Sequence, residues 1–344
     1  MKGRPLIGLS PAARRLAAIG CLVWCLLTLF PLYWVVITAF KTPPGVVGGP
    51  TYLPFVDFTP TIQAFADLYH GIRGEFFRTF LNSTIVGLTS AVVATLIGAM
   101  AAYALVRFEF KVKLLSGLAF LVLALGGYLA FASFGLTRPQ ALLLAFPVAL
   151  FAALAVDLLP LPGPVLANQD ILFWFVSQRM FPPIVTAFAL YLLYSEIGRL
   201  GFPLVDSFLG LTLCYVAFSL PIVVWLMRDF FEALPVEVEE AALVDNVPSW
   251  RIFVGIVVPM SMNGLLATFM ITLAFVWNEF LFALFLTNSR WQTLPILVAG
   301  QNSQRGDEWW AISAAALVAI VPMMIMAAIL GRMMRSGMLL GAIK

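Results

Sequence analysis

The sequence predicts an all-α polytopic membrane protein with about eight transmembrane helices. Of its 344 residues, 62% are apolar and 11% are charged, whereas about a quarter of a soluble domain is charged. The mean hydropathy is +1.00, and several apolar runs approach the roughly 20 residues that a helix needs to cross a bilayer. The net charge of +3 is small and indicates no nucleic-acid partner.

The first two predicted spans cover residues 16–40 and 83–106. Arg14 precedes the first span and Arg107 follows the second, each with further basic residues close by. Because cytoplasmic flanks of spans are enriched in Lys and Arg, both of these ends are expected inside the cell. The polar segment 41–77, which contains Pro and Gly, is then an external loop.

Two further apolar runs form a predicted hairpin at about 114–160, interrupted by GLTRP at 135–139. The last four predicted spans lie at 171–194, 208–231, 261–286 and 311–334. Arg332, Arg335 and Lys344 place the C-terminus in the cytoplasm, which agrees with an even number of crossings. We therefore expect a multi-pass protein with both termini cytoplasmic.

The stretch 232–259, EALPVEVEEAALVDNVPSWRIFVGIVVP, is polar and acidic where most of the chain is apolar. Six of the chain's seventeen acidic residues lie between Asp229 and Asp245. Pro235 is suited to open a short helix, which we predict over 236–244. Counting spans from either end places this stretch on the cytoplasmic side.

The end of this short helix is predicted at Asp245-Asn246, since Asn adopts the left-handed conformation more readily than other residues with a Cβ. Pro248 can start a second short helix. The small pair Ala241-Ala242 in the middle of an exposed helix suits close approach by another protein.

The segment EEAALVDNVPSWRIFVGIVVP resembles the EAA loop of bacterial ABC importer permeases, whose pattern is E-A-A, two residues, D-G, and a later Pro. Asn246 stands where that family usually has Gly. The matching positions are Glu240, Ala241, Ala242, Asp245 and Pro259.

The resemblance extends along most of the chain outside residues 114–170. Four more segments and the ending RSGMLLGAIK are similar to carbohydrate-uptake permeases, in particular the second permease of maltose-type importers. These segments are NSTIVGLTSAVVATLIGAMAAYALVRFEF (82–110), RMFPPIVTAFALYLLYSEIG (179–198), WNEFLFALFLTN (277–288) and TLPILVAG (293–300).

This resemblance implies a six-helix importer permease core with an inserted hairpin. An N-terminal helix and external loop would occupy residues 1–82. The permease core would occupy 83–344, with the extra hairpin at about 114–160 and a cytoplasmic coupling loop at 232–259.

The resemblance also implies that the chain is the permease subunit of an ATP-driven importer in the bacterial cytoplasmic (inner) membrane. It would move a sugar or polyol-type solute inward by alternating access. Its partners would be membrane lipid, a homologous permease subunit, two ATPase subunits and an extracytoplasmic solute-binding protein. The ATPase-coupling residues would be Glu240, Ala241, Ala242, Leu243, Asp245 and Asn246.

The chain contains no phosphate-binding G-x-x-x-x-G-K-[ST] loop, so ATP hydrolysis is expected from a partner. We expect no enzymatic activity, cofactor or metal in this chain. His70 is its only histidine, and no catalytic cluster is evident in the sequence.

Four polar residues fall within predicted spans: Gln178, Arg179, Asn278 and Glu279. A charge at the centre of a membrane helix costs about 2.5 to 3.5 kcal/mol on insertion scales, so each one requires a reason. One interpretation is that they line a water-filled substrate path. The other is that Asn278 and Glu279 tie helices together while Arg179 extends to the membrane edge, and the second interpretation is slightly favoured for Asn278 and Glu279.

The predicted external loop 288–310 is rich in polar residues, and a solvated loop is its default interpretation. The resemblance implies that this region approaches the binding protein, with Gln301, Asn302 and Gln304 as candidate contacts.

Two other function classes remain open at this stage. An ATP-independent secondary transporter or channel would carry its whole binding site and would commonly show repeated halves, and we see no such internal symmetry. An integral membrane enzyme would need a nucleophile, metal or acid-base motif, and none is found.

Overall fold

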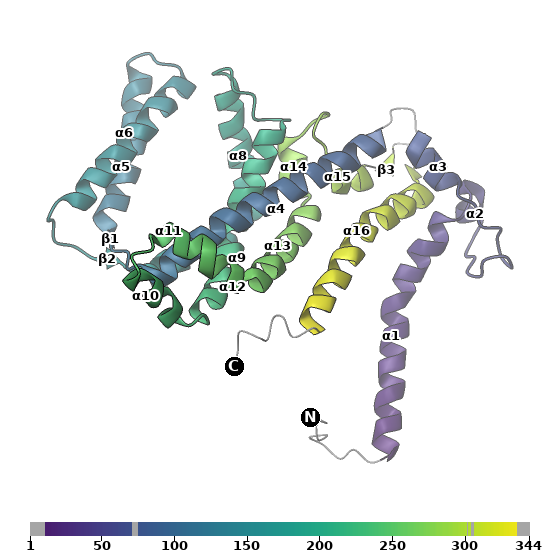
Figure 1. The fold of residues 1–344 in the computed structure, drawn as a ribbon. Helices are drawn as coiled ribbons and strands as arrows, with labels where there is room; N and C mark the ends of the chain where they lie inside the picture. The colour runs from purple at the N-terminus through teal and green to yellow at the C-terminus, as the bar shows by residue number, and fades with distance from the viewer. Residues whose placement is uncertain (1–10, 71–74, 301, 304–305, 336–344) are drawn as a thin grey trace. The chain divides into compact units, whose positions relative to one another are not determined.

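The computed structural model describes residues 11–70, 75–300, 302–303 and 306–335, and it is almost entirely helical (Figure 1). The helical segments are α1 (Pro11–Ala39), α2 (Pro43–Val47), α3 (Gln63–His70), α4 (Glu75–Arg107), α5 (Leu114–Ser133), α6 (Arg138–Leu158), α7 (Asn168–Ser177), η1 (Gln178–Met180), α8 (Pro183–Gly198), α9 (Phe208–Glu232), α10 (Val236–Val244), α11 (Ser249–Ile252), η2 (Phe253–Val257), α12 (Val258–Met260), α13 (Met262–Trp277), α14 (Leu281–Leu286), α15 (Leu294–Ala299) and α16 (Trp309–Arg335). The short antiparallel pairs are β1 (Val112–Lys113) with β2 (Val165–Leu166) and β3 (Asn302–Ser303) with β4 (Gly306–Asp307).

Within the described residues, six helices are long and apolar enough to cross a membrane: α1, α4, α5, α6, α9 and α16. Two bent pairs of helices would raise the number to eight if each pair forms one span. These pairs are α7–η1 with α8 and α11–α12 with α13. The bends are 93° and 78°, respectively. The predicted all-α polytopic architecture is therefore confirmed, and the six to eight candidate spans include the predicted number of about eight.

Two predicted spans are not continuous helices. The span predicted at 171–194 breaks between η1 and α8, where Pro182 and Pro183 lack backbone donors and disfavour the helical conformation of the residues before them. The span predicted at 261–286 stops at Trp277, and α14 follows as a separate short helix. Both breaks occur beside the polar residues that the sequence analysis placed within the spans.

The chain divides into two compact units. One runs up to Phe77 and includes Leu297–Pro322, and the other combines Arg78–Ile296 with the segment from Met323 onward. In the first unit, Lys41 is buried and its ammonium group donates to the carbonyl of Thr51 at 2.6 Å. The predicted boundary at residue 82 stays a prediction.

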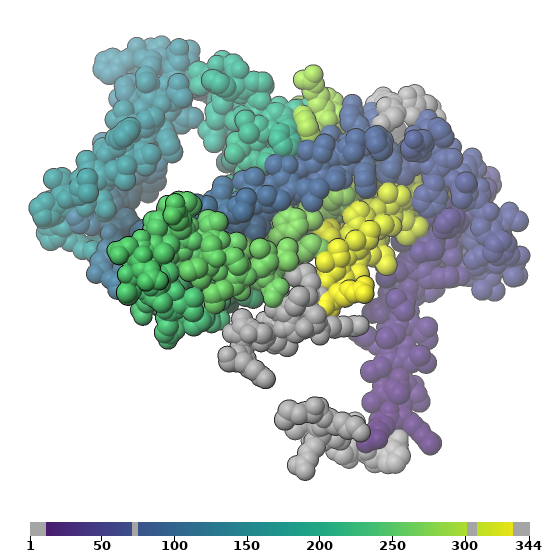
Figure 2. Space-filling model, in the orientation of Figure 1, coloured from purple at the N-terminus to yellow at the C-terminus, as the bar shows by residue number. Residues whose placement is uncertain are grey.

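The second unit has one hydrophobic cluster where α4, α9 and α11 meet, and it includes Ala102, Met227 and Ile252. In Figure 2 the green segment that contains α10 to α12 lies against the blue C-terminal part of α4. A Cβ atom on Gly98 would lie 2.4 Å from Cγ1 of Val223, so this glycine allows α4 and α9 to cross closely.

A second cluster joins α4, α8, α9 and α14 through buried residues that include Val86, Tyr215 and Phe282. The region of the predicted hairpin is occupied by α5 and α6, which run side by side (Figure 1). Alanines at every fourth position of α6 are buried: Ala141, Ala145, Ala149 and Ala153. At the base of the hairpin, the backbone N–H of Lys113 donates to Asp157 at 2.9 Å.

Candidate functional site

The acidic stretch 232–259 folds as a bent pair of short helices, as predicted. Helix α10 begins after Pro235 and ends at Val244, and α11 begins after Pro248. Asn246 has a φ of 56°, which confirms the predicted left-handed turn. The turn brings the N–H of Val247 to 3.0 Å from the carbonyl oxygen of Ala242, so a free carbonyl at the helix end gains a donor.

Most predicted ATPase-coupling residues are accessible on this helix pair. Glu240, Ala241, Leu243, Asp245 and Asn246 are exposed. Ala242 is half-buried and packs against the cluster formed by α4, α9 and α11. The two alanines therefore have different surroundings, because Ala241 is open to solvent while Ala242 holds the helix against the rest of the unit.

The accessible surface of α10 and α11 also carries large apolar side chains. Leu243, Val244 and Trp250 are 53%, 81% and 64% exposed, respectively. Apolar side chains beside exposed carboxylates form a surface that can bind a partner with both packing and ion pairs.

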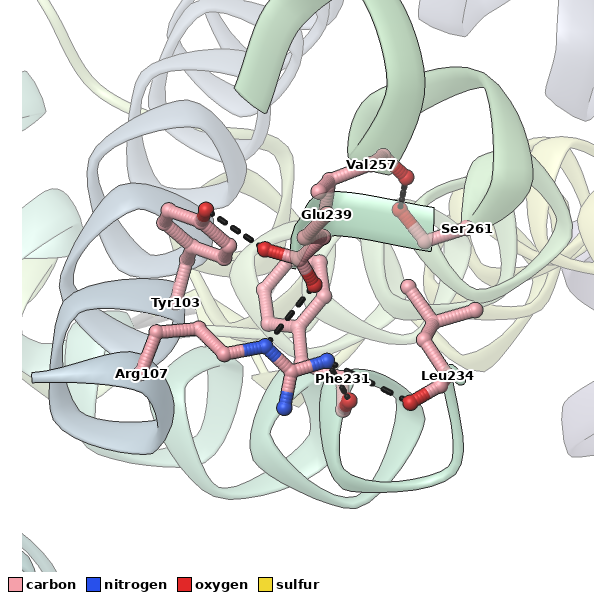
Figure 3. Close-up of polar contacts among 7 residues, drawn as sticks. All are labelled: Tyr103, Arg107, Phe231, Leu234, Glu239, Val257 and Ser261. Carbon is pink, nitrogen blue, oxygen red and sulfur yellow. Dashed lines mark hydrogen bonds and ion pairs between the residues drawn. The ribbon is translucent and has the colours of Figure 1, made fainter. Parts of the chain in front are cut away.

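Glu239, which the sequence analysis did not single out, is buried and anchors α10. Its carboxylate accepts a hydrogen bond from the Tyr103 hydroxyl at 2.7 Å and pairs with Nε of Arg107 at 2.8 Å (Figure 3). The side chains of Arg107 and Glu239 are only 13% and 8% exposed. We name Glu239, Tyr103 and Arg107 the carboxylate clasp.

The clasp connects three helices. Tyr103 and Arg107 are four residues apart near the end of α4, so they lie on one face of it. A terminal nitrogen of Arg107 also donates to the carbonyl oxygen of Phe231 in α9 at 3.0 Å and to that of Leu234 at 3.4 Å. The guanidinium thereby joins α4 to the end of α9 and to the start of the loop that carries α10 (Figure 3).

A sequence signal for the clasp was present in the segment AYALVRF, which ends α4. Arg107 was interpreted only through the positive-inside rule, and Glu239 only as one of several acids. Tyr103 and Arg107 are four residues apart, and this spacing could have suggested a shared partner. The sequence alone did not show which carboxylate that partner is.

The structure places the four polar residues predicted along a substrate path in different surroundings, and their role stays a prediction. Gln178 and Arg179 line a cavity of about 270 Å³. Asn278 lines a different, apolar hollow of about 470 Å³ that is bordered by α13 and α16. The Asn278 side chain donates to the carbonyl oxygen of Ala274 at 2.8 Å, which agrees with a structural role within the helix.

Glu279 caps α14. Its carboxylate accepts hydrogen bonds from the backbone N–H groups of Leu281 and Phe282, with shortest distances of 3.0 and 3.1 Å. This cap explains why the predicted span ends and a new helix begins. In the part of the chain that the structure describes, no ion pair is found between Glu279 and Arg179.

Of the candidate binding-protein contacts, Gln301 and Gln304 lie outside the described residues. Asn302 belongs to β3 and is paired with Asp307 of β4. Their predicted role stays a prediction.

The loop before α15 is held in place by the carboxylate of Asp206. Asp206 accepts hydrogen bonds from the backbone N–H groups of Ser289, Arg290 and Trp291, at 3.2, 3.0 and 3.0 Å. Asn82 of α4 supports the same loop by donating to the carbonyl oxygen of Arg290 at 2.9 Å. Partial burial raises the pKa of Asp206, but the backbone donors lower it more, so the net pKa lies below its ordinary value.

Residues 22–338 match the family described as binding-protein-dependent transport system inner membrane component. A probable ABC transporter permease of Sinorhizobium fredii is 30% identical over 326 residues, covering 94% of each chain. A trehalose/maltose transport system permease of Thermococcus litoralis is 25% identical and covers 96% of this chain and 97% of its own.

A trehalose transport system permease of Mycobacterium tuberculosis is 28% identical over 322 residues, covering 92% of each chain. Among solved structures, a bacterial ABC transporter involved in the import of the acidic polysaccharide alginate has a similar fold. Its TM-score is 0.62 at 15% identity, and the match covers 96% of this chain and 99% of the other. The family match spans nearly the whole described chain, and so this protein belongs to the binding-protein-dependent transport system inner membrane components.

Proposed function

We propose that this chain is the permease subunit of an ATP-driven importer that moves a sugar or polyol-type solute inward. The observation that carries the proposal is the exposed α10–α11 surface, held to α4 and α9 by the carboxylate clasp. The relatives named as trehalose/maltose and trehalose permeases support the solute class.

In this proposal, α10 is the coupling helix. Glu240 and Asp245 provide carboxylates for basic groups of a separate ATPase subunit. Ala241 permits close approach, Leu243 adds apolar contact, and Asn246 makes the turn that presents α10. A displacement of α10 by the ATPase would be transmitted to α4 and α9 through Glu239 and Arg107. Movement of these helices would then open the transport path to one side of the membrane at a time.

The proposal places α10 in the cytoplasm, together with both termini, in the bacterial inner membrane. The assembly would contain a homologous permease, two ATPase subunits and an extracytoplasmic solute-binding protein. The loop held by Asp206 and Asn82 would lie on the external side, where its backbone hydrogen bonds would give the binding protein a rigid surface to dock on.

Ala241→Trp tests the coupling surface. Because Ala241 is exposed, the larger side chain can be accommodated without disturbing the core, but it would block close approach by a partner. We expect normal membrane insertion and loss of ATPase co-purification. The matched control is Ala130→Trp on the exposed surface of α5, which should retain the ATPase. Normal ATPase yield with Ala241→Trp would refute the proposed contact.

A further inference from the structure

The cavity of about 270 Å³ at the break between η1 and α8 contains a cation, Arg179, that has no polar partner among the described residues. Arg179 enters this cavity from η1, and α8, α9 and α14 supply the other walls. Its Nε atom is buried and has no hydrogen-bond acceptor. Across the described residues, no hydrogen bond or ion pair to any nitrogen of this guanidinium is found.

The surroundings of Arg179 are aromatic. The guanidinium carbon lies 4.9 Å from the centre of the Phe218 ring and 5.5 Å from that of Phe275. Aromatic faces attract a cation and hold the planar guanidinium in a fixed position. They accept no conventional hydrogen bond from its N–H groups, so the strong donors of Arg179 remain available to a ligand.

Among the described residues, the carboxylate of Glu279 forms no ion pair with Arg179. Glu279 is occupied by the backbone N–H groups at the start of α14, at distances from 3.0 Å. Phe282, which receives this cap, also forms part of the cavity wall. In the described part of the chain, no carboxylate pairs with Arg179.

The cavity also offers neutral polar groups. Gln178 and Thr186 lie on its wall together with the aromatic residues Phe181, Phe218 and Phe282. An amide and a hydroxyl can donate to oxygens that flank an anion. Irregular backbone at membrane depth is tolerated where it lines a cavity, and the segment between η1 and α8 meets this condition.

We infer that this cavity binds an anionic oxygen group, a carboxylate or a phosphate, with the guanidinium of Arg179 as its principal ligand. The planar fork of Arg matches two oxygens of either group, and the apolar walls strengthen the interaction. The group belongs either to an acidic solute or to the headgroup of an anionic lipid. If it belongs to the solute, the inference rests on the proposed importer function and narrows its substrates to acidic sugars.

The test measures binding directly on the full chain in nanodiscs of phosphatidylcholine, without ATPase or binding protein. One arm titrates D-glucuronate, with neutral D-glucose as its comparison, by calorimetry. The other arm adds phosphatidylglycerol to the discs and counts retained anionic lipid by native mass spectrometry. The variant is Arg179→Gln, and Arg199→Gln is the matched control, because Arg199 is exposed and already pairs with Glu196 at 2.8 Å.

We expect binding of glucuronate or retention of phosphatidylglycerol that is about tenfold weaker in Arg179→Gln, from the loss of a charge-assisted pair, and unchanged in Arg199→Gln. Arg179→Lys keeps the positive charge but loses the planar two-nitrogen geometry of the guanidinium, so it should show an intermediate affinity. This graded result would distinguish the loss of the ligand contact from misfolding of the Gln variant. Dependence on Arg179 in the first arm assigns the anion to the solute, and dependence in the second assigns it to lipid.

Binding of glucose equal to that of glucuronate, together with lipid retention unaffected by Arg179→Gln, would overturn the inference. Absence of binding in both arms would do the same. ATPase co-purification with Ala241→Trp is measured separately, so failure of the anion site and failure of the proposed function are distinguishable.

Discussion

Glu239→Ala should release α10 from α4. The change removes the acceptor of two short hydrogen bonds, one from Tyr103 at 2.7 Å and one from Arg107 at 2.8 Å. A hydrogen bond to a charged group contributes about 1.5 to 3 kcal/mol, and breaking a buried pair costs about 3 to 5 kcal/mol. Arg107 keeps the carbonyl oxygens of Phe231 and Leu234, so the low end applies, about 3 kcal/mol for local opening of α10.

Native-state hydrogen exchange measures this local opening. Because about 1.4 kcal/mol corresponds to a factor of ten, amides of α10 should exchange about a hundredfold faster in Glu239→Ala. The control is Glu237→Ala, since Glu237 is an exposed carboxylate on the same helix. Amides in the middle of α4 should be unaffected in both variants. Protection of α10 that is equal in Glu239→Ala and in the native protein would refute the clasp as its anchor.

Two further predictions concern loop geometry. Asn246 has a φ of 56°, a conformation that a β-branched side chain disfavours, so Asn246→Val should destabilise the turn by about 1 to 2 kcal/mol. The Val247 amide should then exchange about tenfold faster in Asn246→Val and near the native rate in Asn246→Gly. Equal rates in the two variants would contradict this. Asp206 has a depressed pKa in the folded protein, so its stabilisation of the 289–291 loop is complete above the unfolded pKa of about 3.9 and is lost as pH falls through the lower folded pKa. Exchange protection of these amides, corrected for intrinsic rates, should therefore be lost progressively as pH falls below about 4 in the native protein. In Asp206→Asn it should already be reduced above that pH; identical profiles would contradict the role of the carboxylate.

Much of the local structure followed from the sequence. Hydropathy located the long helices, because a chain in lipid must satisfy its backbone polar groups within each span. Pro235, Asn246 and Pro248 marked the boundaries of α10 and α11 correctly, since each residue restricts the backbone by itself. Hydropathy did not show the breaks after η1 and at Asn278, because short apolar helices on either side of a break have the composition of one continuous span.

The sequence by itself determined that this chain is a helical membrane protein with an acidic two-helix loop and no phosphate-binding motif of its own. Only the tertiary structure decided that Glu239 is buried while its neighbour Glu240 is exposed. Successive residues on a helix point about 100° apart, and which direction faces a neighbouring helix depends on where that neighbour packs. For the same reason, the sequence did not show that Arg179 faces a cavity while Glu279 caps a helix.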